Sequence, residues 1–230
     1  MCWNRRPAVE TLLKTVLCFG DSNTWGFVPA GDGKRFPWEI RWPGVLQGAL
    51  GDSYRVIEEG LSGRTTVLND PFVPHRNGLN YLIPCLESHK PLAWVVIFLG
   101  ANDLCDRYAM TAADIARGAA TLAAATLKSE SGRDGRAPHV LVLGLPRLGP
   151  ALPETMSRAA PKAAELSRCF SAAAEEAAVP LVDLAQVTAF SSLDGIHLDA
   201  EGHSVVAAAV GSAISSWPIA TTQRTASSTA

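Results

Sequence analysis

A serine, a histidine and an aspartate have the residue types and the spacing that nucleophilic catalysis requires. Ser22 ends an apolar run in the stretch CFGDSNTWG, and Asp194 and His197 lie three residues apart in DGIHL. A serine hydroxyl becomes a good nucleophile when an imidazole takes its proton and a carboxylate holds that imidazole in the required tautomer. We therefore predict that Ser22 is a nucleophile, His197 its general base and Asp194 the orienting acid. The stretch around Ser22 is by itself more typical of a plain turn, because Gly, Asp and Ser are common turn residues.

Acyl transfer also needs hydrogen-bond donors for the oxyanion of a tetrahedral intermediate. The side-chain amide of Asn102 and the backbone N–H of Ser22 can serve as donors. Gly63 has no Cβ, so the backbone there can approach a substrate closely. We expect Ser22, Gly63 and Asn102 to form an oxyanion hole.

The pattern of apolar runs predicts a scaffold that brings these residues together. Five runs rich in Val, Ile and Leu lack polar alternation, which is typical of strands covered on both faces of a parallel sheet. The predicted strands are 15–19, 54–57, 94–99, 140–143 and 180–184. Helical patterns between and after them cover 42–50, 79–89, 112–128, 156–178 and 200–216. This alternation predicts a parallel, doubly wound α/β sheet.

In open α/β sheets, ligands bind beyond the carboxyl ends of the strands. Polar clusters follow the predicted strands at that edge: Ser22 follows the first, residues 61–63 the second, 100–103 the third and 194–197 the fifth. We therefore expect residues from both ends of the chain to meet at one edge of the sheet.

These clusters resemble the sequence blocks of the SGNH, or GDSL-type, hydrolases over about residues 14–216. The matching blocks are GDSNTWG (20–26) with Ser22 as nucleophile, EEGLSGRTT (58–66) with Gly63 as oxyanion donor, LGANDL (99–104) with Asn102, and DGIHL (194–198) with Asp194 and His197. The resemblance implies a flavodoxin-like three-layer α/β/α sandwich with a five-stranded parallel sheet in the order 2-1-3-4-5.

Within that family, the chain is most similar to the bacterial arylesterase and acyltransferase branch. The similarity lies in GDSNTWGF, in RWPGVL (41–46) and in VIEEGLSGRTT (56–66). This branch implies assembly of several subunits around restricted active-site channels, so we expect a homo-oligomer. Asn23 departs from the family pattern, which often has Leu at this position, and it adds polarity beside the nucleophile.

An aromatic-rich segment, residues 25–42, follows the nucleophile. It is well placed to form the wall of an acyl or alcohol pocket, because binding residues concentrate on loops and pockets are lined by aromatic side chains. The predicted pocket residues are Trp25, Phe27, Trp38 and Trp42, with Phe36 beside them. The alternative interpretation is a subunit contact or a small satellite core.

Other polar residues have simpler interpretations. We read Asp21 as a turn former or helix N-cap. His203 follows His197 in EGH, but it has no third ligand at a useful spacing, so no metal site is predicted. We expect Asp103 to orient its loop, Cys105 to be a buried thiol and Ser62 a turn residue. His75, His89 and His139 are read as surface or loop histidines.

Length, composition and charge set limits on the function. The chain has 230 residues, of which 47% are apolar and 18% charged, and this suits one globular domain with its own core. We expect an N-terminal extension at 1–13, a hydrolase domain at 14–217 and a flexible tail at 218–230. The net charge of −2, without a Lys/Arg-rich block, gives no reason to expect a nucleic-acid or membrane partner.

Five cysteines occur singly, without a CxxC pair or a His-spaced pair, so we expect neither a disulfide framework nor a zinc site. Free thiols, no N-terminal apolar signal region and no apolar run of membrane-spanning length together favour the cytoplasm.

The sequence therefore predicts a serine esterase that acts on small short-chain or aryl esters through an acyl-enzyme. Water or another alcohol would accept the acyl group, and no cofactor or metal is expected. A carbohydrate O-deacetylase with the same triad is an alternative. A flavodoxin-like module that binds a phosphate is another, but the chain has no Gly-rich phosphate loop.

Overall fold

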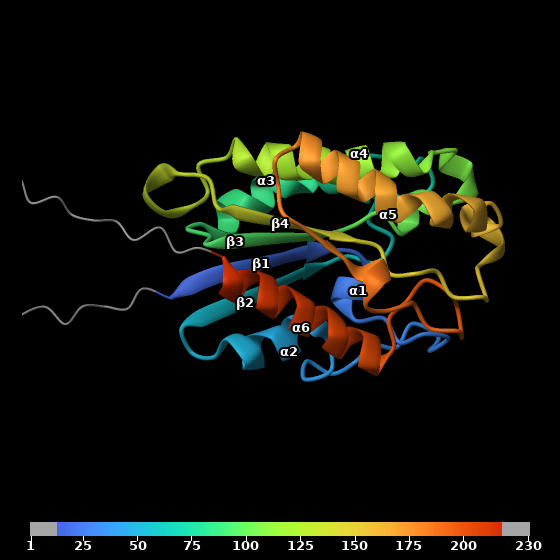
Figure 1. Cartoon of the computed structure of the whole chain (residues 1–230), viewed down its shortest axis with the longest axis horizontal. Helices are drawn as coiled ribbons and strands as arrows, with labels where there is room; N and C mark the ends of the chain where they lie inside the picture. Colours follow the sequence, from blue (N-terminus) through green and yellow to red (C-terminus); the bar gives the residue numbers. More distant parts are fainter. Residues whose placement is uncertain (1–12, 218–230) are drawn as a thin grey trace, which may run out of the picture.

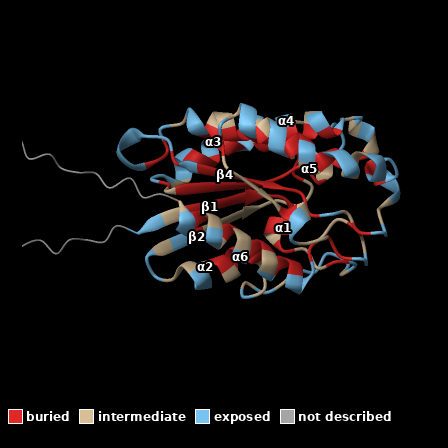
Figure 2. Ribbon diagram, in the orientation of Figure 1, coloured by how far each residue is buried: buried red, intermediate tan, exposed pale blue. Residues whose placement is uncertain are grey.

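Five parallel strands form the central sheet of the computed structural model, which describes residues 13–217 (Figure 1). Their order across the sheet is β2-β1-β3-β4-β5, so the predicted order is confirmed. The strands are β1 (Lys14–Gly20), β2 (Tyr54–Gly60), β3 (Trp94–Phe98), β4 (His139–Gly144) and β5 (Leu181–Asp183). Each lies where an apolar run predicted it. β1 and β3 sit in the middle of the sheet and are almost wholly buried (Figure 2).

Helices cover both faces of this sheet, which gives the predicted three-layer α/β/α sandwich. Figure 1 shows α3, α4 and α5 on one face and α2 and α6 on the other. The helices are α1 (Ser22–Trp25), α2 (Trp42–Leu50), α3 (Gly78–His89), α4 (Ala112–Leu127), α5 (Ala159–Glu176) and α6 (Ala200–Ser216). All five predicted helices are present, and α2 and α6 match their predicted bounds residue for residue.

The predicted helix at 156–178 begins later than the sequence pattern indicates. Residues Glu154–Met156 form a separate 3-10 turn, and α5 starts at Ala159. The intervening residues bind Asp106 instead, which accepts hydrogen bonds from the Ser157 hydroxyl (2.6 Å) and the Arg158 backbone N–H (3.1 Å). These side-chain contacts compete with the first turn of the helix.

The expectations for the cysteines and for the two chain ends can be compared with the structure within residues 13–217. Cys18, Cys85, Cys105 and Cys169 are buried free thiols, whereas Cys2 lies outside residues 13–217. The predicted extension and tail also lie outside them, apart from Leu13. No helix within 13–217 is both long and apolar enough to cross a membrane.

Helix α2 packs closely against the aromatic-rich segment, and Gly44 makes this approach possible. A Cβ at Gly44 would lie 1.9 Å from the Trp38 backbone oxygen, so either the helix or the segment would have to move. We predict that Gly44→Ala lowers the free energy of unfolding by about 1–3 kcal/mol, the usual cost of overpacking. Urea or thermal unfolding measures this change.

Gly48→Ala in the same helix is the matched control. A Cβ there meets no atom within 4 Å, and the residue is exposed. It should raise the free energy of unfolding by about 0.5–1 kcal/mol, because alanine is the better helix former. Equal effects of the two substitutions would contradict the packing argument.

Candidate active site

The three residues predicted to act together do meet at the carboxyl edge of the sheet. His197 Nε2 lies 3.0 Å from Ser22 Oγ, and His197 Nδ1 lies 2.8 Å from Asp194 Oδ2. Ser22 is the first residue of α1, directly after β1, while Asp194 and His197 lie in the loop before α6. The line from hydroxyl to imidazole to carboxylate is the geometry in which a histidine can take the serine proton.

Helix α1 was not predicted as an element, yet it holds Ser22 in place. Asp21 caps this helix, since its Oδ1 accepts a hydrogen bond from the Asn23 backbone N–H at 2.9 Å, and this confirms its N-cap interpretation. The helix rests on Gly60 at the end of β2, where a Cβ would lie 2.2 Å from the Trp25 backbone nitrogen. A larger residue at position 60 would push α1 away from the sheet.

Backbone donors fix the Asp194 carboxylate and keep it ionised. Its Oδ1 accepts from the N–H groups of Ile196 (3.3 Å) and His197 (3.1 Å), and its Oδ2 also accepts from Ala30 N–H (3.2 Å). Partial burial by itself would raise the pKa of Asp194. The hydrogen bond and charge of His197 and these backbone donors outweigh it, so the pKa lies below its ordinary value. An ionised Asp194 favours the tautomer that leaves His197 Nε2 free to accept a proton.

The expected oxyanion donors lie around the same point. Asn102 Nδ2 donates to the Arg64 backbone oxygen (3.0 Å) and to Asp21 Oδ2 (3.3 Å). Gly63 has a φ of +80°, a left-handed conformation that suits glycine. Neither the Ser22 nor the Gly63 backbone N–H donates to another group within residues 13–217. Both remain available to a ligand.

A cavity of about 250 Å³ opens beside these donors. Gly63, Asn102 and Ile196 line it on the side of the candidate triad. The rest of the lining combines the polar side chains of Asp70, Arg76, Arg107, Tyr108 and Thr155 with Cys105 and the apolar Val73, Pro153 and Met156. The Cys105 side chain is buried, as expected, although it borders the cavity.

Two buried aspartates support the loops behind the site. Asp103 accepts hydrogen bonds from the Thr66 backbone N–H at 3.1 Å and from its hydroxyl, and so ties the loop after β3 to the loop after β2. Burial raises the pKa of Asp103 to about 6, although the Thr66 hydrogen bonds oppose the rise. Burial likewise raises the pKa of Asp21 to about 7, against the hydrogen bonds from Asn23.

The aromatic-rich segment contacts the candidate site in a way that corrects one expectation. Phe27 stacks on the His197 ring at 4.4 Å between centroids, and Trp25 and Trp38 are half-buried. Trp42, in contrast, is fully buried and belongs to the core. Its Nε1 donates to Thr24 Oγ1 at 3.3 Å and its ring meets the edge of Phe98, because the start of α2 faces the sheet. Trp42 therefore has no surface to offer a pocket.

His203 is a core residue of α6 with no exposed surface. Its Nδ1 accepts a hydrogen bond from the Trp42 backbone N–H at 3.2 Å, and burial lowers its pKa to about 4, so the ring is neutral near pH 7. Within residues 13–217, His203 belongs to no group of three metal-ligating side chains.

Asn23 is a positioning residue that the sequence analysis noted only as a departure from the family pattern. It follows Ser22 in α1, and its side chain is almost fully buried. Its Nδ2 donates to the Ile196 backbone oxygen at 3.1 Å, and its Oδ1 accepts from the Leu198 N–H at 2.9 Å. Because these partners flank His197, Asn23 joins the helix of the serine to the loop of the histidine.

We predict that Asn23→Ala lowers kcat for a p-nitrophenyl ester by about 10- to 100-fold, because small misplacements of reacting groups are costly. KM should change little, since the side chain does not face the cavity. Asn80→Ala, which removes an exposed asparagine from α3, is the control and should act like the wild type. A folded Asn23→Ala protein with wild-type kcat would show that the link has no role in positioning.

The chain is similar to known proteins over most of its length. Residues 18–205 match the GDSL-like lipase/acylhydrolase family. Among solved structures, an aryl esterase from M. smegmatis is 40% identical with a TM-score of 0.83, and the match covers 88% of this chain and 99% of that one. A carbohydrate acetylesterase from Sinorhizobium meliloti is 37% identical with a TM-score of 0.82, covering 88% and 98% of the two chains.

A putative arylesterase from Agrobacterium tumefaciens is 33% identical with a TM-score of 0.80, and the match covers 88% of this chain and 99% of that one. The comparison with curated proteins gives no match. The family match extends over most of the chain and includes all the blocks that the sequence analysis identified. The chain therefore belongs to the GDSL-like lipase/acylhydrolase family, the SGNH hydrolases, and it is a carboxylic ester hydrolase.

Proposed function

We propose that this enzyme hydrolyses small esters, of short-chain acids or aryl alcohols, through a covalent acyl-enzyme on Ser22. The observation that carries the proposal is the continuous line of short contacts from Ser22 Oγ to His197 (3.0 Å) and from His197 to Asp194 (2.8 Å). No other residue type in the site is needed to activate the hydroxyl.

The proposed reaction has two halves. Ser22 Oγ attacks the ester carbonyl while His197 Nε2 takes the hydroxyl proton, and collapse of the tetrahedral intermediate expels the alcohol, which takes that proton from His197. Water then attacks the acyl-enzyme in the same way and releases the acid and free Ser22. Asp194 stays ionised and stabilises the imidazolium of His197 in both halves.

The oxyanion of each intermediate would bind between three donors. These are the free backbone N–H groups of Ser22 and Gly63 and the side-chain amide of Asn102. The Asn102 amide carries two hydrogens. We assign to the oxyanion the one that forms the longer hydrogen bond, 3.3 Å to Asp21. Such preorganised donors stabilise the transition state more than the ground state.

Ser22→Ala should lower kcat by roughly 10³-fold or more while the protein keeps its fold, because one hydroxyl contributes little packing. A fluorophosphonate probe should label Ser22 in the wild type, as peptide mass analysis would show, and should not label the variant. Ser204→Ala, on the exposed face of α6, is the control. Substantial ester hydrolysis by a folded Ser22→Ala protein would exclude the acyl-enzyme mechanism.

Carbohydrate O-deacetylation is the second candidate, and Arg76 in the lining of the cavity favours it. Arg76 lies over Gly63, with its Nε 3.4 Å from the position of a Cβ there, and it forms no ion pair within the described residues. A guanidinium beside the oxyanion donors can bind the hydroxyl oxygens of a sugar. The similarity to a carbohydrate acetylesterase supports the same candidate.

A panel of p-nitrophenyl esters from acetate to decanoate, run beside an acetylated xylan, tests both candidates. A cavity of about 250 Å³ suits short acyl groups, so kcat/KM should fall as the chain lengthens. If sugars are the substrates, Arg76→Ala should lower kcat/KM for the xylan by at least about tenfold more than for p-nitrophenyl acetate. Equal losses on both substrates would contradict the carbohydrate assignment.

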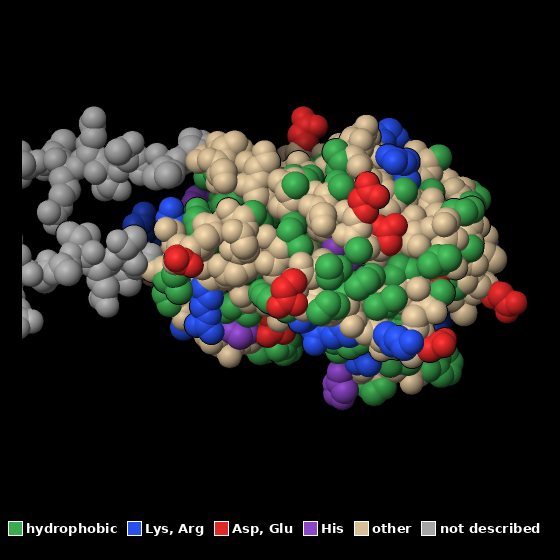
Figure 3. Space-filling model, turned by 90° about the horizontal axis from the view of Figure 1, so that it is seen from below, with side chains coloured by type: hydrophobic (Ala, Val, Ile, Leu, Met, Phe, Trp, Pro, Cys, Tyr) green, Lys and Arg blue, Asp and Glu red, His purple; other side chains and the backbone are tan. Residues whose placement is uncertain are grey.

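We further infer a homo-oligomer that transfers acyl groups to alcohols. Phe72 and Leu193 leave 80% and 66% of their surface exposed, and Phe27, one of the half-buried aromatic residues of 25–38, stacks on His197. Figure 3 shows other apolar side chains at the surface, interspersed with charged ones. Packing of such groups between subunits would form an apolar channel, which lowers the activity of water and favours an alcohol acceptor. The cytoplasm is the proposed location, in line with the free thiols.

Light scattering should give a mass well above the 24.3 kDa of the chain. Vinyl acetate and benzyl alcohol in buffer should yield benzyl acetate faster than hydrolysis removes it, because the acyl-enzyme partitions to the alcohol. A monomer would exclude the assembly, and formation of acetate alone would exclude the transfer.

A further inference from the structure

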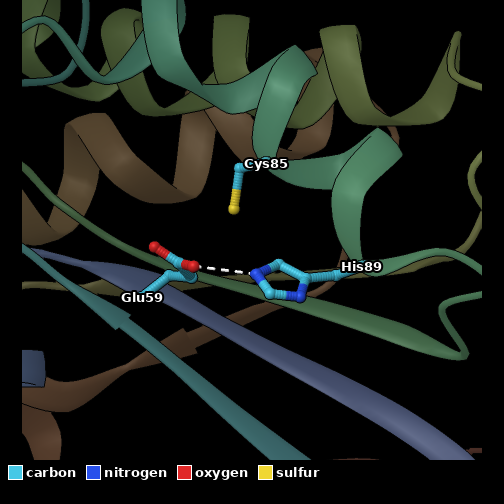
Figure 4. A group of neighbouring side chains, drawn as sticks. All are labelled: Glu59, Cys85 and His89. Carbon is cyan, nitrogen blue, oxygen red and sulfur yellow. Dashed lines mark hydrogen bonds and ion pairs between the residues drawn. The ribbon is translucent and has the colours of Figure 1, made fainter.

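A second cluster of reactive side chains lies away from the triad, between the edge strand β2 and helix α3. It consists of Glu59, Cys85 and His89, whose carboxylate, thiol and imidazole donor atoms all lie within 4.8 Å of one another. Figure 4 shows the Cys85 sulfur directed from α3 toward the gap between the other two side chains. His89 Nε2 and Glu59 Oε1 lie 2.8 Å apart. None of the three forms a hydrogen bond with Ser22, Asp194 or His197 among the described residues.

Local geometry explains why these groups converge. Cys85 and His89 are four residues apart in α3, so they lie on the same face of the helix. Glu59 is the last residue but one of β2, and its side chain points toward α3 (Figure 4). Cys85 is 1% exposed, whereas the side chains of Glu59 and His89 are 21% and 26% exposed. An ion from solvent could therefore reach the cluster between Glu59 and His89.

The donor set favours one class of ion. Thiolate sulfur and imidazole nitrogen suit zinc and similar borderline-soft cations, while magnesium and calcium prefer oxygen ligands alone. Zinc binds sulfur at about 2.3 Å and nitrogen or oxygen at about 2.0–2.2 Å, so its ligand atoms lie within about 4 Å of one another. The three donor atoms lie within 4.8 Å of one another, so binding requires them to approach by less than about 1 Å.

The surrounding charges are compatible with a divalent cation. A bound Cys85 thiolate and the Glu59 carboxylate would balance its two charges, and His89 would bind as the neutral ring. The Tyr81 hydroxyl donates to Glu59 Oε2 at 3.3 Å. The buried Arg64 guanidinium carries a positive charge nearby, which opposes the binding of a cation. Its hydrogen bonds to the Gly20 and Glu59 backbone oxygens hold it in place.

We propose that Glu59, Cys85 and His89 form a zinc site, with a water molecule as the fourth ligand. Binding breaks the hydrogen bond between His89 and Glu59, forms a zinc–sulfur bond and releases the thiol proton of Cys85 to solvent. The ion would join the last turn of α3 to the edge strand, so its main effect is on stability rather than on the ester reaction. The sequence analysis expected no zinc site because it found neither a CxxC pair nor a His-spaced cysteine, and it thereby overlooked Cys85 and His89, which are four residues apart in α3. Glu59 lies earlier in the chain, on β2.

Metal binding by the full-length protein tests the proposal directly. After treatment with a chelator, the wild type should bind one equivalent of Zn²⁺ in competition with a chromophoric chelator, and the ion should raise Tm. Co²⁺ in place of Zn²⁺ should give the near-ultraviolet absorption of a thiolate–cobalt bond. Cys85→Ser should abolish this absorption, whereas Cys169→Ser, which changes another buried thiol on α5, should retain it.

His89→Gln is an independent variant, because its partly exposed side chain can change without opening the core. It should weaken Zn²⁺ binding by at least about 100-fold, since the loss of a residue that only hydrogen-bonds to a metal ligand already lowers the metal affinity 10- to 100-fold. His75→Gln, on an exposed loop, is the matched control and should bind like the wild type. Absence of binding to the wild type, or equal binding by wild type and His89→Gln, would overturn the proposal.

Discussion

The position of Ser22 depends on the close packing of one short helix, α1, on two glycines. Gly20 and Gly60 are paired at the carboxyl ends of β1 and β2, and α1 rests against both. A Cβ at Gly20 would lie 2.0 Å from Thr24 Oγ1, and one at Gly60 would lie 2.2 Å from the Trp25 nitrogen. A helix of four residues has too few internal hydrogen bonds to be stable alone, so this contact and its cap hold it. The sheet thereby fixes the direction in which Ser22 leaves the strand.

The same edge of the sheet concentrates buried polar groups that form hydrogen bonds with the backbone and side chains of neighbouring loops and strand ends. Asp103 binds Thr66, and Arg64 donates to the Gly20 backbone oxygen while its own carbonyl accepts from Asn102. Burial raises the pKa of Asp103 and lowers that of Arg64, so it costs free energy to keep either side chain charged. Such a network is stable only when complete, and it gives the oxyanion loops a single arrangement.

The sequence predicted the sheet, and it predicted that Ser22, Asp194 and His197 would meet, for physical reasons that also explain what it missed. Buried parallel strands are continuous apolar runs, and the triad residues lie next to those runs. Asn23 could not be found in this way, because its partners are backbone atoms of a loop at the far end of the chain. Trp42 was placed in the pocket because it belongs to an aromatic-rich segment, but composition does not reveal which way a side chain faces. Helix α1 is too short to show a helical period.

The aromatic-rich segment, residues 25–42, contacts the residues around His197 and therefore does more than form the wall of a pocket. Ala30 donates to the Asp194 carboxylate, and Phe27 stacks on the His197 ring. Asn23 binds the same loop through the residues that flank His197. The imidazole is therefore held by groups that do not themselves need to touch a substrate. Substitutions in this segment should disturb the alignment of His197 with Ser22 before they change the shape of the pocket. The reason is that displacements too small to affect binding are large enough to disturb this alignment.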